Sequence, residues 1–201
     1  MSMEDVRAEP EVVRLHARSV ELFLDRVTTI PQDRWAGPTP CADWDLRALV
    51  NHVVGEDRWT VPLLEGRTIG EVGHALDGDL LGASPDQAAQ EAGRAAVDAF
   101  TVPGAIERTV SLSFGETPAA VYAWQLFADH LIHAWDVAAA SGGDLTLGDD
   151  LVNACAGWFA GVEDDYRSFG AVDERVEVGP EASAQDRLLA AFGREPRWAP
   201  G

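Results

Sequence analysis

The amino-acid sequence predicts an all-α fold, a four-helix bundle with long connections, one short extended ribbon and a small C-terminal helix. The main observation is a series of segments in which apolar residues recur at spacings of three and four, the period of an amphipathic helix. The second is that Pro and Gly mark where these segments begin and end. Helices that bury such apolar stripes against one another form a bundle around one core.

The bundle helices can be placed in chain order. The first begins at Pro10 and carries an apolar seam in which His16 is the one polar member. Acidic residues begin the second, Ser84-Pro-Asp-Gln87 has the pattern of a capping box that opens the third, and Gly142-Gly143 ends the fourth. The expected helices, with a fifth after the bundle, cover residues 10–30, 43–62, 85–100, 118–141 and 149–168.

The connecting segments are predicted to be long and irregular. A glycine-rich stretch over residues 66–82 is interpreted as a loop that could form a lip over a site, because long loops are often functional. Residues 107–114 alternate apolar and polar side chains, which favours one short strand or ribbon. In the tail, residues 175–178 are expected to be extended, and Ser183 is expected to cap a small helix over 184–192.

Length and charge limit the class of protein. The 201 residues predict a single domain with a real core, made of a bundle over about residues 10–168 and a C-terminal appendage over 169–201. The formal charge is −19, from 15 basic and 34 acidic residues, and no basic stripe is present. This balance argues against nucleic acid and against anionic membrane surfaces as partners.

The cysteines and the hydropathy pattern indicate a compartment. Cys41 and Cys155 lie far apart in the sequence, which does not suggest a disulfide framework and suits a reducing environment. Cys41 precedes a helix start, where the helix N-terminus could lower the pKa of its thiol. We see neither the build of a signal peptide nor an apolar run near the roughly 18 residues that span a bilayer. We therefore expect a cytoplasmic protein.

Asp129 and His133 form the most informative pair in the chain. They lie four residues apart in an expected helix, so both side chains point to one face about one turn apart. A carboxylate and an imidazole at this spacing can hold one metal ion, as two histidines do. His52 lies on the second expected helix, and packing of the two helices would add a third ligand. Three protein ligands leave positions open on the ion, which is typical of a catalytic site.

Two carboxylates lie one turn beyond the candidate ligands. Glu56 follows His52 and could be a fourth ligand or a general base, or an ordinary solvated carboxylate. Asp136 follows His133 and could orient that imidazole, as carboxylates around metal sites often do, or have only a packing role.

Four other side chains could contribute. Arg58 could receive a carboxylate of a substrate or thiol cofactor, and Trp59 could line the mouth of a pocket, although an exposed arginine and a core tryptophan are commoner. His16 is most simply a hydrogen-bonded core or boundary histidine, and contact with the site or the substrate is the alternative. His130 is interpreted as a neighbour of the core or a group behind the ligands, and ligation of the metal is the alternative.

Two stretches resemble a known family. Thr39-Pro-Cys-Ala-Asp-Trp-Asp-Leu-Arg-Ala-Leu-Val-Asn-His52 and Asp129-His-Leu-Ile-His-Ala-Trp-Asp136 are similar to the metal-binding domain of mycothiol-dependent maleylpyruvate isomerase. They are also similar to related actinobacterial metal-binding proteins of the DinB-like superfamily, whose usual end resembles the closing segment 193–198. The resemblance covers roughly residues 10–198 and implies a DinB-like bundle.

The resemblance also implies a metal centre. The family's metal triad falls on His52, Asp129 and His133, although the isomerase has Glu at the carboxylate position and a sizeable second domain after the bundle. Such an ion lowers the pKa of a coordinated thiol or water. Zinc suits these ligands, and Ni, Fe and Mn stay open because two histidines and one carboxylate also hold non-haem iron.

The function implied is a metal-dependent thiol S-transferase or isomerase that acts on a small electrophile, with mycothiol or a similar thiol as cosubstrate. Two alternatives stay open: a non-catalytic metal- or ligand-binding module, and a metal-dependent hydrolase that uses bound hydroxide with Glu56 as its base. A homodimer is expected from the superfamily. The sequence identifies neither the electrophile, nor the thiol, nor the resident metal.

Overall fold

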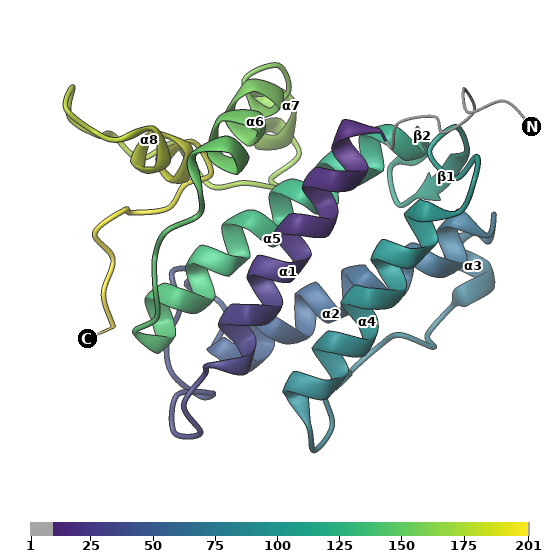
Figure 1. The fold of residues 1–201 in the computed structure, drawn as a ribbon, viewed down its shortest axis with the longest axis horizontal. Helices are drawn as coiled ribbons and strands as arrows, with labels where there is room; N and C mark the ends of the chain where they lie inside the picture. The colour runs from purple at the N-terminus through teal and green to yellow at the C-terminus, as the bar shows by residue number, and fades with distance from the viewer. Residues whose placement is uncertain (1–9, 201) are drawn as a thin grey trace, which may run out of the picture.

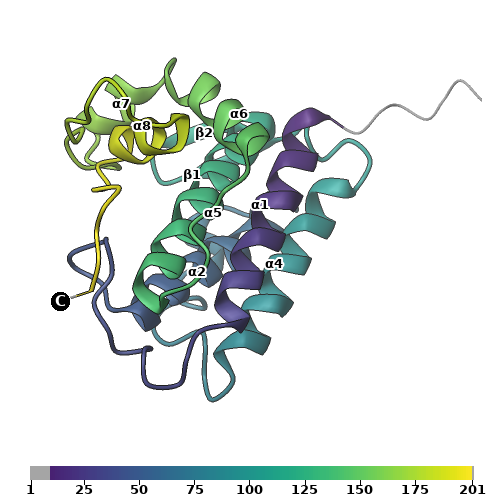
Figure 2. The same ribbon diagram turned by 60° about the vertical axis from the view of Figure 1, so that its left-hand side comes forward.

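The computed structural model describes residues 10–200, which form eight helices and one two-stranded hairpin. Four long helices lie against one another as a bundle, and the predicted all-α class is confirmed (Figure 1; Figure 2). The bundle helices are α1 (Glu11–Thr28), α2 (Leu46–Leu64), α4 (Pro85–Thr101) and α5 (Ala119–Ser141). The other elements are α3 (Ile69–Val72), α6 (Asp149–Phe159), α7 (Glu163–Ser168), α8 (Ala184–Ala191), β1 (Thr109–Leu112) and β2 (Gly115–Pro118).

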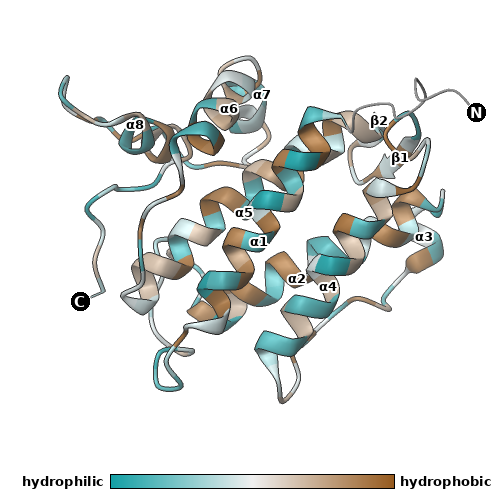
Figure 3. Ribbon diagram, viewed as in Figure 1, coloured by the Kyte–Doolittle hydropathy of each residue, from teal (hydrophilic) through white to brown (hydrophobic). Residues whose placement is uncertain are grey.

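Helix α5 is the centre of the bundle. It packs most extensively on α1 and also contacts α2 and α6, and nearly every residue from 126 to 140 is buried. Figure 3 shows that α1 and α4 alternate hydrophilic and hydrophobic residues along their length, as amphipathic helices do. A helix buried on all sides is normally apolar, so the polar residues inside α5 need partners of their own. They are Asp129, His130, His133 and Asp136.

Helix α2, which carries four of the candidate site residues, begins at a side-chain cap and ends in the buried core. The side chain of Asp45 caps its first turn by accepting a hydrogen bond from the amide of Ala48, at 2.8 Å. We expected the helix to end by Pro62, but it continues for two more residues. Leu63 and Leu64 are buried in the core, and their packing holds the last turn beyond the proline.

Two predicted helix features are wrong. Ser84 makes no side-chain capping bond, although Pro85 does occupy the first turn of α4. The single helix expected over 149–168 is broken, because α6 ends at Phe159 and α7 begins at Glu163. Gly161 lies in the break, and the run of acidic residues after it favours a new helix N-terminus.

The connections also contain more structure than we expected. The stretch over 66–82 includes the short helix α3, and Thr68 and Glu71 cap the N-terminus of this helix with a reciprocal capping box. The strand expected over 107–114 is β1, and it pairs antiparallel with β2, which the sequence did not suggest. Residues 175–178 form no strand within the described part of the chain, since only the amide of Val176 bonds across, to the carbonyl of Ala190 at 3.0 Å.

The C-terminal segments pack beside the bundle. Helices α6, α7 and α8 lie together at one side of it (Figure 2), and α8 packs on α6. The rings of Phe159 and Phe192 stack with centroids 3.9 Å apart. Ser183 caps α8 as predicted, by accepting a hydrogen bond from the amide of Asp186. Among residues 10–200, no helix combines the length and the apolar character needed to cross a bilayer.

We predict that Phe159→Ala destabilises the protein by about 3–5 kcal/mol, because the ring is only 1% exposed and its loss leaves a cavity under Phe192. Phe169→Ala is the matched control, since that ring is 80% exposed and its loss should cost less than about 0.5 kcal/mol. Urea denaturation measures both. Equal urea midpoints for the two variants would show that the stacking of Phe159 on Phe192 does not stabilise the packing of the C-terminal segments.

Candidate metal centre

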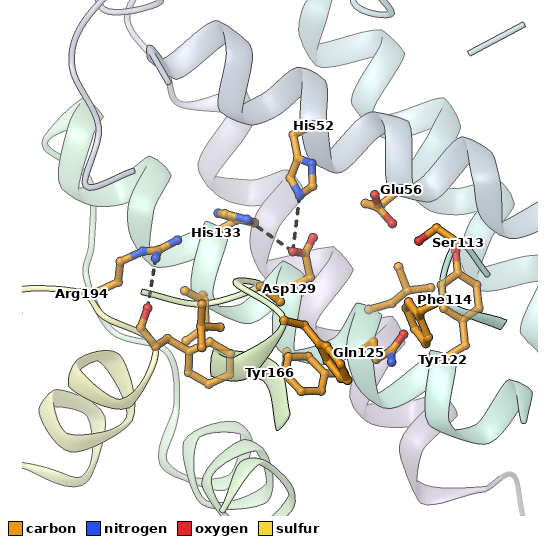
Figure 4. Close-up of a pocket in the computed structure, with 17 residues that line it drawn as sticks. His52, Glu56, Ser113, Phe114, Tyr122, Gln125, Asp129, His133, Tyr166 and Arg194 are labelled. Atoms are coloured by element: carbon orange, nitrogen blue, oxygen red, sulfur yellow. Dashed lines mark hydrogen bonds and ion pairs between the residues drawn. The ribbon is translucent and has the colours of Figure 1, made fainter. Parts of the chain in front are cut away.

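The three residues of the predicted triad come together where α2 faces α5 (Figure 4). Oδ1 of Asp129 lies 3.5 Å from Nε2 of His52 and 3.3 Å from Nε2 of His133. One ligand atom from each residue lies within 4.8 Å of the other two. The His133 side chain is nearly buried, whereas those of His52 and Asp129 are 30% and 27% exposed. The cluster is therefore open on one side.

The donor set of this cluster fits a divalent cation. Oδ2 of Asp129 is buried and has no hydrogen-bond partner among the described residues. Burial alone would raise the pKa of Asp129, but His133 and His52 hold it well below its usual range. Burial would likewise lower the pKa of His133, yet Asp129 and Asp136 hold it well above its usual value. Two imidazole nitrogens and a carboxylate are ligands that zinc and iron accept.

Asp136 positions the His133 ring. Its Oδ2 lies 2.9 Å from Nδ1 of His133, which leaves Nε2 free to face Asp129. Arg194 holds the other side of Asp136, with its Nε donating to Oδ1 at 3.1 Å. Of the two roles considered for Asp136, the structure shows contact with the imidazole, the arrangement that sets the ring orientation of metal-binding histidines.

Cys41 joins the same network. Its sulfur lies 3.3 Å from Oδ2 of Asp136 and accepts a hydrogen bond of 2.9 Å from Arg194. A helix N-terminus could lower the pKa of this thiol, but burial raises it. The partly buried thiol therefore does not have the depressed pKa that marks a reactive cysteine.

Sequence reasoning missed Arg194. It lies in a tail far along the chain from the other site residues, and only tertiary packing brings it to Asp136. The one available signal was that it falls in the closing segment whose pattern resembles the family. Burial would lower the pKa of its guanidinium, but Asp136 and Cys41 raise it, so the group stays charged.

A cavity of about 590 Å³ opens over the triad (Figure 4). Its lining is mainly apolar and aromatic, as in most small-molecule sites. Glu56 lies on its wall, one helical turn from His52, and burial together with the negative charge of Asp129 raises the pKa of this carboxyl. The aromatic and polar residues that line the cavity include Phe114, Tyr122, Gln125, Tyr166 and Phe169.

The structure does not bring Arg58 and Trp59 to this cavity. Arg58 is six residues from His52, so it points to another side of α2, where it donates to the carbonyl of Leu80 at 3.0 Å. Trp59 is two turns beyond His52 and packs against a separate apolar cluster that includes Leu63. Their expected roles in binding a substrate or cofactor therefore have no support from the geometry.

A helical bundle with two histidines and a carboxylate at the floor of a cavity belongs to a class of metal-site bundles. The sequence model of the mycothiol maleylpyruvate isomerase N-terminal domain matches residues 16–138, which contain His52, Asp129 and His133. The chain belongs to this DinB-like family, and the resemblance drawn from the two motifs is confirmed.

Two curated relatives extend the likeness beyond the matched domain. They are uncharacterised proteins from two strains of Mycobacterium tuberculosis, and each is 32% identical to this chain over 191 residues. Each alignment covers 90% of this chain and 97% of the relative. No solved structure matches the chain.

We predict that Asp136→Asn costs about 3–5 kcal/mol at pH 7, because it leaves the buried charge of Arg194 without its partner. Burial would raise the pKa of Asp136, but Arg194 and His133 lower it. The carboxylate therefore stabilises the fold fully above the ordinary pKa near 4, and this contribution is lost as the pH falls through the lowered value. The stability gap between wild type and variant should narrow only below about pH 4.

Urea denaturation in chelator, repeated from pH 7 downward, measures this gap. Asp150→Asn is the control, because Asp150 also pairs with an arginine, Arg18, but its side chain is 61% exposed. Its loss should change the stability far less than the loss of Asp136, because solvent screens an exposed pair. Equal costs for the two substitutions would contradict the structural role of the buried pair.

Proposed function

We propose that this protein is a divalent-metal-dependent enzyme that transfers a mycothiol-type thiol to a small electrophile, or isomerises the resulting adduct. The observation that carries this proposal is the open cluster of His52, Asp129 and His133 at the floor of a 590 Å³ cavity. Membership of the isomerase-domain family supports the thiol as cosubstrate. The unpaired cysteines suit the cytoplasm as the compartment in which such a thiol is used.

The ion would be held by Nε2 of His52, a carboxylate oxygen of Asp129 and Nε2 of His133. A divalent ion bound there supplies a Lewis acid that lowers the pKa of a coordinated thiol. Zinc is the ion we favour for two imidazoles and a carboxylate with open positions. Asp136 keeps His133 in the orientation that the ligand needs, and Arg194 keeps Asp136 charged and in place.

Glu56 is the candidate proton acceptor. It lies on the cavity wall beside His52, and its raised pKa brings the carboxyl closer to the pH at which it can take and return a proton. The apolar lining of the cavity excludes water and suits an electrophile with an apolar body. Phe114, from the turn of the hairpin, and Phe169, after α7, are both exposed and line the same cavity.

A hydrolase is the second candidate, and the position of Glu56 favours it. The same carboxylate could take a proton from a water molecule that attacks an ester or amide. The two functions differ in their need for a thiol. Reaction of an electrophile only when a thiol is present supports the transferase, whereas cleavage in buffer alone supports the hydrolase.

We predict that His133→Ala lowers the metal content of the purified protein by about one ion per chain, because a site with three protein ligands does not survive the loss of one. His74→Ala is the matched control, since its side chain is 97% exposed and lies outside the cluster. Plasma mass spectrometry measures both variants and the wild type. Unchanged metal in His133→Ala would refute the triad.

We predict that Glu56→Gln lowers kcat for thiol conjugation by about 10²–10⁴-fold with unchanged metal content, because the amide cannot accept a proton. Glu65→Gln, at the exposed C-terminal end of the same helix, is the control and should retain full activity. Conjugation of small electrophiles with a cysteine-derived thiol, followed by loss of free thiol, gives the rate. A fully active Glu56→Gln enzyme would remove Glu56 from the mechanism.

A further inference from the structure

A second cluster of ligand-type side chains lies inside the bundle, separate from the triad. His16 of α1, Asp57 of α2 and His130 of α5 are 0%, 1% and 0% exposed. One ligand atom from each residue lies within 4.8 Å of the other two, a limit that the triad also meets. The helices that carry them pack directly, α5 against both α1 and α2 (Figure 1). The cluster shares no residue with the triad.

The contact between His130 and Asp57 needs a positive charge. Nδ1 of His130 lies 2.8 Å from the carbonyl oxygen of Leu126, which can only accept, so Nδ1 carries a hydrogen. Nε2 then lies 3.1 Å from Oδ1 of Asp57, but neither atom has a partner with hydrogen-bond geometry among the described residues. In the neutral ring this nitrogen presents a lone pair to a carboxylate oxygen, so a positive charge must complete the contact, either a proton on the ring, whose pKa Asp57 raises against the effect of burial, or a bound cation.

His16 supplies a further free lone pair. Both of its ring nitrogens are buried without a hydrogen-bond partner among the described residues. The ring stands edge-on to His130, with centroids 5.4 Å apart, and edge-on to Phe100. Burial lowers the pKa of His16, so the ring stays neutral and keeps a nitrogen lone pair. A buried polar group in this state is normally satisfied by a partner that the site is built to hold.

We propose that His16, Asp57 and His130 hold one zinc-type divalent cation in a closed structural site that joins α1, α2 and α5. Ligand atoms around tetrahedral zinc stand roughly 3.3 Å apart, close to the 3.1 Å between Nε2 of His130 and Oδ1 of Asp57. A Cβ added at Gly93 of α4 would lie 3.4 Å from Oδ2 of Asp57, so α4 closes the site from that side.

The two clusters have different chemistry. The triad opens to a cavity, whereas the second cluster has no exposed ligand, so its ion takes up no substrate and fastens helices far apart in sequence. Because the ligands come from three helices, we expect the ion to be loaded as the bundle forms. The ion would bind only the folded chain and would therefore stabilise it.

The test counts ions by plasma mass spectrometry in protein refolded with Zn²⁺ and then desalted. We expect about two ions per chain in the wild type, and one each in His133→Ala and in His16→Phe, whose ring fits beside Phe100. His74→Ala should keep both. Unchanged zinc in His16→Phe would overturn the proposal and leave His130 as a protonated partner of Asp57. If only His133→Ala loses zinc, the triad binds an ion and the inner cluster does not. If only His16→Phe loses zinc, the inner cluster binds an ion and the triad does not.

A second measurement needs no variant. Crystals of the wild-type protein refolded with Zn²⁺, with anomalous data collected at the zinc edge, should show a peak between His16, Asp57 and His130 in addition to any peak at the triad. A peak at the triad alone, or none in the bundle interior, would overturn the proposal. Asp57→Asn, which keeps the shape of the side chain, should abolish the inner peak and leave the outer one.

Discussion

The pairing of carboxylates with positive charge inside the bundle is the constraint on which the rest of the structure depends. An unpaired buried carboxylate costs several kcal/mol, so a helix face that carries one can turn inward only where a cation or a protonated imidazole meets it. This requirement fixes the rotation of α5 against α1 and α2. The pairs are Asp57 with His130, Asp129 with His52 and His133, and Asp136 with His133 and Arg194.

One helix thereby serves two environments. Successive residues of an α-helix are turned by about 100°, so neighbours in sequence face different partners. Asp129 and His133 face His52 of α2 and the cavity, whereas His130 faces Asp57 of α2, His16 of α1 and the closed interior. The long apolar surface of α5 holds this rotation in place, because a shift would expose core residues such as Leu131 and Trp135.

Local pattern predicted the bundle and paired Asp129 with His133, because helix period and ligand spacing are properties of short segments. The resemblance to the family was needed to add His52, which lies on a different helix. Local pattern failed where long-range packing decides. Nothing in the sequence placed Arg194 against Asp136, since the tail reaches it only through the fold. The contact of His16 and His130 with Asp57 also depends on how three helices are rotated relative to one another. The sequence of a single helix does not determine this rotation.

The residues that line the cavity come from two parts of the chain. The ligands and Glu56 lie within residues 16–138, the part that matches the isomerase-domain family. Much of the opposite wall comes from residues after that part, including Tyr166 and Phe192, which the packing of α6 and α8 carries to the site. Metal ligation therefore rests on the part of the chain that the family shares. Under the proposed function, the choice of electrophile would rest on the C-terminal segments, and relatives with the same ligands and a different tail would accept different substrates.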